Sequence, residues 1–206
     1  MKRARAVLLG IMILAAAGPA FAQAPRGGQG RQGGRQGGGR GPAAPAITTL
    51  AGDIQADWAR TRQLITGIAE AMPEDKYNAK PTPAEQTFGE RVMHIATTDL
   101  FILQALGGKT PPPMINQKAT SKSDILASLK QTFDYGEAVI KEFNDQQWNE
   151  RVMPPPFMGP SASRIRIVYF DMQHSEDIYG QLVVYLRLNG GVPPASQPRG
   201  QRPPEP

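Results

Sequence analysis

The sequence predicts an all-α fold: a four-helix bundle with long connectors, at least one of them long enough to serve as a crossover. Between residues 47 and 191, four segments repeat apolar side chains about every 3.6 residues, the period of an amphipathic helix. No segment alternates apolar and polar residues for long enough to predict a strand, because the β-prone Val183-Val184-Tyr185 lies inside a helical pattern. Proline-rich connectors separate the four segments.

The first two helices have recognisable ends. The first runs from near Thr49 to Met72, and Pro73 stops it. The second begins around Thr87, where Glu90 three residues later completes a capping box, and Gly107-Gly108 ends it.

The third and fourth helices are predicted in the same way. Ser123 is expected to cap the third, which continues to Phe143, and the fourth starts near Ser161 or Ser163 and ends at Asn189-Gly190. The connectors are about 14 to 18 residues long, whereas antiparallel neighbours in a bundle need only about 2–8. At least one connector can therefore run the length of the bundle.

Composition divides the chain into four parts. Residues 1–22 read as a signal peptide, with a basic start, an apolar core too short to span a bilayer and a small-residue cleavage site before Gln23. Residues 23–46 are a Gly-, Arg- and Gln-rich linker, and residues 192–206 a Pro-rich tail, both expected to be disordered. Residues 47–191 form the one folded domain. We therefore expect an exported, periplasmic or extracellular protein without an integral membrane segment after cleavage.

The basic charge of the whole chain does not belong to this domain. Residues 47–191 carry 14 Lys and Arg against 17 Asp and Glu, a net charge of −3. A nucleic-acid-binding fold would carry its basic patch on the folded surface, so no specific nucleic-acid partner is expected. The absence of cysteine excludes disulfides and a lipid-anchored cysteine.

The only two histidines are the strongest candidates for chemistry. His94 lies in the second helix and His174 in the fourth, so two helices can bring two imidazoles together as the start of a metal site. Asp177 and Asp171 lie three residues after and before His174, and either would complete a two-histidine, one-carboxylate set. The alternative is that both of these carboxylates, with Glu176, belong to the solvated helix surface.

Three short motifs mark the domain. They are Pro73-Glu74-Asp75-Lys76-Tyr77, Phe88-Gly89-Glu90 running on to His94-Ile95, and Gly180-Gln181-Leu182 with Tyr185-Leu186-Arg187 and Gly190. Together they resemble the DinB/YfiT-like family (DinB superfamily) of four-helix-bundle metalloenzymes, over the first, second and fourth helices.

The resemblance implies a divalent metal held by three histidines, one from the second helix and two, four residues apart, from the fourth. His94 matches the first of these and His174 the second, while Ile178 occupies the usual third-histidine position. The resemblance therefore implies a degenerate site, for which Asp177 is the candidate third ligand. Nickel, zinc or iron is the cofactor that this site would take.

Two functions stay open, beside the third possibility of a purely structural oligomer. In the first, an exported DinB-like protein with this degenerate site binds a small molecule or a metal in the bundle pocket without catalysis. The alternative is an active metal-dependent transferase or hydrolase that uses a carboxylate as third ligand; for some relatives the resemblance implies transfer that depends on a thiol cofactor. No catalytic residue is identified, and a homodimer is a further expected partner.

Overall fold

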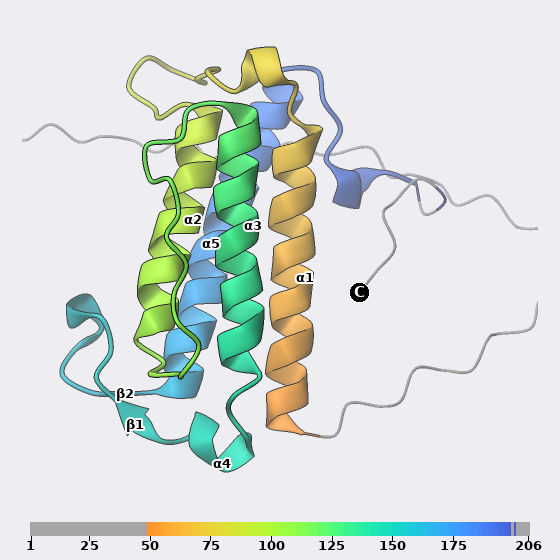
Figure 1. Cartoon of the computed structure of the whole chain (residues 1–206). Coiled ribbons are helices and arrows are strands. Elements are labelled where there is room, and N and C mark those ends of the chain that lie inside the picture. Colours follow the sequence, from red (N-terminus) through yellow and green to blue (C-terminus); the bar gives the residue numbers. More distant parts are fainter. Residues whose placement is uncertain (1–48, 199, 201–206) are drawn as a thin grey trace, which may run out of the picture. The chain divides into compact units, whose positions relative to one another are not determined.

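The computed structural model describes residues 49–198 and 200, and it is built on four long helices (Figure 1). These are α1 (Leu50–Ala71), α2 (Phe88–Gln104), α3 (Lys122–Ile140) and α5 (Arg164–Leu188). The predicted all-α four-helix bundle is therefore confirmed. The signal peptide and the linker up to residue 46 lie outside the described residues.

The four helices form a ring in the order α1, α3, α2, α5, each packed against its two neighbours. In Figure 1, α1 and α5 run upward and α2 and α3 run downward. Because α2 and α3 run the same way, residues 105–121 must return along the bundle, and they do so as the long green segment. The expected crossover is thus the connector between α2 and α3.

Local capping explains where the helices begin. The Thr87 hydroxyl accepts a hydrogen bond from the Glu90 amide (3.1 Å), and the Glu90 carboxylate accepts one from the Thr87 amide (2.6 Å), so the predicted capping box forms. The prediction that Ser123 caps the third helix is wrong. Ser121 is the cap, accepting from the Asp124 amide at 3.1 Å, and Ser123 lies within the first helical turn.

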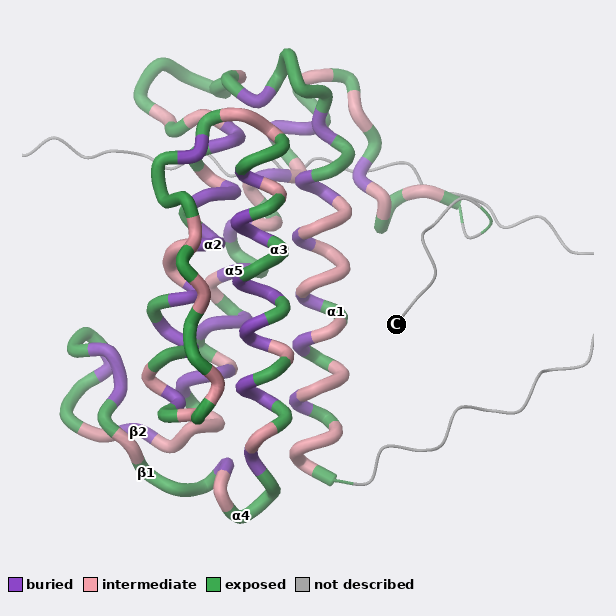
Figure 2. Tube along the Cα trace, viewed as in Figure 1, coloured by how far each residue is buried: buried purple, intermediate pink, exposed green. Residues whose placement is uncertain are grey.

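The core fills the centre of the ring, where buried positions of all four helices face inward (Figure 2). Trp58 of α1 is fully buried and its ring lies 5.4 Å from that of Phe133 on α3. A Cβ atom at Gly136 would lie only 2.1 Å from the Trp58 ring, so α3 has a glycine where the indole packs. The largest other fully buried side chains are Trp148, Phe88, Ile54, Ile65, Ile68, Met72, Ile95, Ile102, Leu103 and Leu106.

The connector between α3 and α5 carries short elements that the sequence did not predict. α3 ends at Ile140 rather than Phe143, and the chain continues through α4 (Asp145–Trp148) and two two-residue strands. These are β1 (Arg151–Val152) and β2 (Ala162–Ser163), which pair antiparallel, with the 3-10 turn η2 (Pro156–Met158) between them. Ser163 caps α5, one of the two starts predicted.

The ends of the bundle are covered by further short turns. The 3-10 turn η1 (Glu74–Lys76) follows α1, and η3 (Pro194–Ser196) packs on α1, where Pro194 approaches Gly67.

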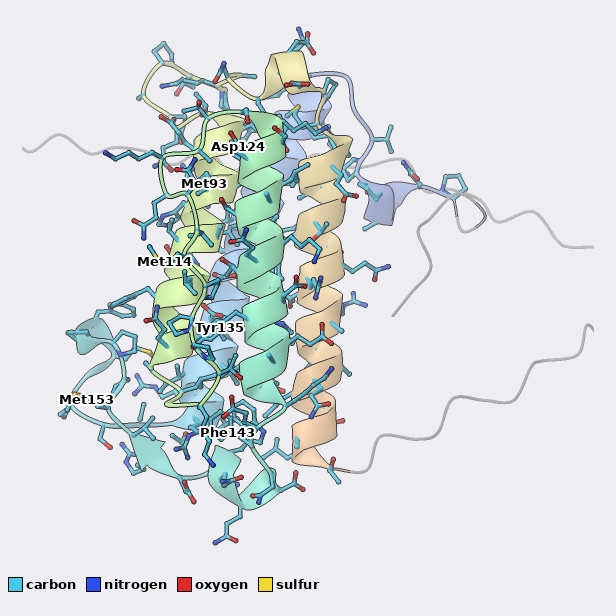
Figure 3. All side chains as sticks on the ribbon, viewed as in Figure 1. Met93, Met114, Asp124, Tyr135, Phe143 and Met153 are labelled. Atoms are coloured by element: carbon cyan, nitrogen blue, oxygen red, sulfur yellow. The ribbon has the colours of Figure 1, made fainter. Side chains whose placement is uncertain are left out.

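The tail expected to be disordered from residue 192 is described at 192–198 and 200, and the rest lies outside the described residues. Figure 3 shows Met114 on the crossover segment and Met153 on the connector before α5; both are exposed.

Candidate metal centre

The two histidines of the chain meet across the interface between α2 and α5. The Nε2 atoms of His94 and His174 lie 3.3 Å apart, and the ring centroids are 5.2 Å apart with the planes inclined at 67°. The sequence could place each histidine on a helix, and the structure shows that both helices present them at the same height. His94 is exposed and the side chain of His174 is 23% exposed, so the pair lies at the rim of the interface and not in the bundle interior.

The surroundings of the outer ring, His94, disfavour its protonated form. Partial burial lowers the pKa of His94, and the neighbouring His174 and the Arg91 guanidinium lower it further. Its Nδ1 atom lies 3.4 Å from the Thr98 hydroxyl, one turn along α2. A neutral imidazole keeps a lone pair for a metal ion or a hydrogen-bond donor.

The inner ring, His174, faces a buried carboxylate. Its Nδ1 atom is 3.8 Å from Oδ1 of Asp99, a residue of α2 that is completely buried. The Ser175 hydroxyl lies 2.9 and 2.8 Å from the two Asp99 oxygens and donates to that carboxylate. Histidines that bind metals commonly direct their second nitrogen to a carboxylate in this way.

Asp171 lies behind Asp99 and is also completely buried. Burial raises the pKa of Asp171 well above its ordinary value, and the Asp99 carboxylate raises it further, while neither Asp171 oxygen has a hydrogen-bond partner among the described residues. Two ionised carboxylates offer each other only acceptor oxygens, whereas a protonated Asp171 can donate a hydrogen bond. The interpretation of Asp171 as solvated surface is therefore wrong, whereas Glu176 and Asp177 are exposed.

Asp99 was not among the candidates from the sequence, although a signal was present. It falls on the apolar face of its helix, in register with Val92, Ile95 and Leu103, and Asp171 has the same relation to its own helix. A carboxylate at a core position must find a partner, and the facing helix provides it.

The predicted third ligand, Asp177, is hydrogen-bonded within its own helix. The Asp177 carboxylate is exposed and accepts a hydrogen bond from the Gln181 amide at 2.9 Å. Ile178, at the usual third-histidine position, is only 3% exposed and packs in the core. Across residues 49–198 and 200, no group of three or more His, Cys, Asp or Glu side chains is placed to hold a metal ion. Metal ligation by Asp177 stays a prediction.

The two imidazoles fit two positions of a metal ion. Zinc–nitrogen bonds of about 2.0–2.1 Å at a tetrahedral angle place two ligand nitrogens about 3.3 Å apart. The Nε2 atoms lie at that separation. Imidazole suits zinc, nickel and iron alike, so the donor set does not select among them.

A separate cavity lies away from the two histidines. A groove of about 790 Å³ follows α1 and α3, on the side of the ring opposite α2 and α5. Trp58, Arg62 and Glu137 are among the residues that line it, and neither histidine is.

Within the described part of the chain, no helix is both long and apolar enough to cross a bilayer.

Fold and site together define a four-helix bundle with paired histidines on its second and last long helices. Residues 57–182 match the DinB superfamily, which is more than half of the chain. The chain belongs to the DinB superfamily. Among curated proteins, none matches its sequence.

Three solved structures share this fold at low sequence identity. A DinB-like protein from Bacillus cereus ATCC 10987 is 18% identical, with a TM-score of 0.61 over 70% of this chain and 95% of the other. The DinB-like protein YjoA from Bacillus subtilis is 18% identical, with a TM-score of 0.56 over 73% and 99%. YfiT from Bacillus subtilis, described as a probable metal-dependent hydrolase with an unusual four-helix bundle topology, is 15% identical, with a TM-score of 0.53 over 74% and 95%.

Proposed function

We propose that this chain is an exported member of the DinB superfamily that binds a divalent metal ion between His94 and His174. The metal is nickel, zinc or iron, and the site has two of the three histidines that its family resemblance implies. The observation that supports this most strongly is the 3.3 Å separation of the two Nε2 atoms. The description of YfiT as a probable metal-dependent hydrolase supports a metal in this fold.

A two-imidazole site binds a metal weakly. Structural zinc sites with four ligands bind with about 10–16 kcal/mol, so two ligands supply about half, which corresponds to a dissociation constant of about 10⁻⁴–10⁻⁶ M. The Arg91 guanidinium, which also lowers the pKa of His94, repels a cation at the same place. The remaining coordination positions are open to water or to donor atoms of a small molecule.

A bound divalent metal would supply a Lewis acid at an exposed site. The chain's own contribution is to hold two imidazoles at a fixed separation. Ile178 contributes an apolar contact where a third ligand would stand, which favours reversible binding over catalysis.

Metal titration of the full mature chain tests the proposal. The protein is purified without a histidine tag, because the chain's own two histidines form the site, and zinc or nickel is added in a calorimeter. We expect one site with micromolar or weaker affinity that is lost in His94→Ala and kept in Gln173→Ala, an exposed control position on α5. Binding that persists in both His94→Ala and His174→Ala would overturn the proposal.

The second candidate is a metal-dependent hydrolase that uses Asp177 as third ligand, which the description of YfiT favours. Asp177→Asn separates the two candidates. The proposed two-histidine site predicts unchanged affinity in this variant, because Asp177 is not one of its ligands and accepts a hydrogen bond from Gln181. A loss of about 100-fold would instead support the carboxylate ligand, since each ligand contributes about 3 kcal/mol.

Export is a separate part of the proposal. It rests on the sequence of residues 1–22, and it predicts that the mature chain begins at Gln23. Mass spectrometry of the protein recovered from the envelope fraction of its host checks it. An intact N-terminus in the cytoplasmic fraction would contradict export.

A further inference from the structure

The two histidines belong to a line of four polar side chains that crosses from the surface to the core. The Thr98 hydroxyl is 3.4 Å from Nδ1 of His94, Nε2 of His94 is 3.3 Å from Nε2 of His174, and Nδ1 of His174 is 3.8 Å from Oδ1 of Asp99. Each neutral imidazole has one nitrogen that donates and one that accepts. The protons along the line can therefore point inward or outward, and the two directions are not equivalent.

The inward direction satisfies every neighbour. The Thr98 hydroxyl donates to Nδ1 of His94, Nε2–H of His94 donates to Nε2 of His174, and Nδ1–H of His174 points at the Asp99 carboxylate. In the outward direction, Nδ1 of His174 would turn a lone pair toward a buried carboxylate. Two acceptors facing each other in a medium of low dielectric repel, so the outward direction is disfavoured.

We propose that Asp99 is a positioning residue that fixes the proton of His174 on Nδ1 and so presents the Nε2 lone pair toward His94 and the metal position. The 3.8 Å gap is longer than a hydrogen bond, and such contacts commonly tighten when the site is filled. Nδ1 of His174 is buried and has no hydrogen-bond partner among the described residues, so Asp99 is the acceptor that it faces.

Asp99 can do this because it is itself held. The Ser175 hydroxyl, on the residue next to His174, donates to both of its oxygens. Asp171, also on α5, lies close enough to Asp99 for the two acids to shift each other's pKa, and the side chains of Asp99, Asp171 and Ser175 are all buried. Because Ser175 lies next to His174 on α5, its hydrogen bonds keep the Asp99 carboxylate beside that histidine.

The tautomer of His174 can be measured without any metal. Long-range ¹H–¹⁵N correlation spectra of metal-free, ¹⁵N-labelled protein at about pH 8, above the ordinary imidazole pKa of about 6.5, show which nitrogen carries the proton. We expect Nδ1–H for His174 and Nε2–H for His94 in the wild type. A wild-type His174 protonated on Nε2 would overturn the proposal, whatever the variants do.

Three variants separate positioning from structural support. Asp99→Leu removes the acceptor and is expected to reduce the Nδ1–H population of His174, while Asp99→Asn keeps an acceptor oxygen and is expected to restore part of it. Asp171→Asn changes the same buried cluster without removing the acceptor from Nδ1, and is expected to leave the tautomer unchanged. An unchanged tautomer in folded Asp99→Leu would also overturn the proposal; if that variant does not fold, the wild-type spectrum decides.

The consequence for metal binding rests on the proposed function. Loss of an outer partner of a metal-binding histidine lowers affinity about 10–100-fold, and we expect this loss of zinc affinity in Asp99→Leu. The two proposals fail separately. A wild type that binds no metal but has Nδ1–H on His174 contradicts the metal site alone, whereas metal binding with Nε2–H on His174 contradicts the role of Asp99 alone.

Discussion

Replacing Ile178 with histidine should rebuild the metal site that the family resemblance implies. Ile178 lies one turn after His174 on α5, and its side chain is 3% exposed. An imidazole there would add the third ligand of a three-histidine set. The change also removes an apolar side chain from the core, so it affects stability as well as binding.

The two effects have opposite signs and can be measured separately. Without metal, the loss of a buried isoleucine and the burial of a polar ring should lower the free energy of unfolding by about 2–4 kcal/mol. With metal, the third ligand should add about 2.5–4 kcal/mol of binding free energy, or about 10²–10³-fold in affinity. At 100 times the dissociation constant, bound metal then raises the stability by about 2.7 kcal/mol.

Competition with a chromophoric chelator measures the affinity, and urea unfolding with and without zinc measures the stability. Ile178→Gln is the matched control, because it buries a polar side chain at the same place without an imidazole. The gain should disappear in Ile178→His combined with His94→Ala. A folded Ile178→His protein with wild-type affinity, or a gain that survives His94→Ala, would refute the reasoning.

Three further predictions concern the fold around the site. Gly136→Ala should lower the free energy of unfolding by about 1–3 kcal/mol, because the new Cβ would lie 2.1 Å from the buried Trp58 ring. Gly180→Ala should raise it by about 1 kcal/mol, because no atom lies within 4 Å of the Cβ position there. Equal effects of the two variants in urea unfolding would contradict this. Thr87→Ala should cost about 1 kcal/mol in the same assay through the lost cap of α2, and no change would mean that the capping box is not formed in solution. The raised pKa of Asp171 means that the folded wild type holds a proton that the unfolded chain releases, so the wild type should lose stability as pH rises from about 4.5 to 8. Asp171→Asn has no such proton and should therefore become more stable relative to the wild type over the same range. Asp99, the charged group that acts on Asp171, is present in both proteins, and a stability difference that does not change with pH would contradict the assigned proton.

Local signals predicted the helices well, because caps and apolar periodicity depend on residues close in sequence. Thr87 and Glu90 form the box that their spacing indicates. Ser121 and Ser123 show the limit of local signals. Both residues are of a type that caps helices, both lie at the start of α3, and their hydroxyls are 3.0 Å apart. Which of the two caps the helix depends on where the crossover segment ends.

Predicting the site would have required the relative positions of α2 and α5, which the sequence alone does not determine. Both histidines could be named, but their meeting at one height depends on how α2 and α5 pack along their lengths. Asp99 and Asp171 could be recognised as carboxylates on apolar faces, yet only the packed structure shows that they face each other. The short α4, β1 and β2 elements lack any periodic pattern because they are too short to carry one.

The most direct test of the central claim is X-ray absorption spectroscopy of the tag-free wild-type protein loaded with zinc or nickel. The two-histidine site predicts two imidazole ligands per metal at about 2.0–2.1 Å, with oxygen donors such as water filling the remaining positions. A spectrum with only oxygen ligands, or one that is the same in His94→Ala, would contradict it.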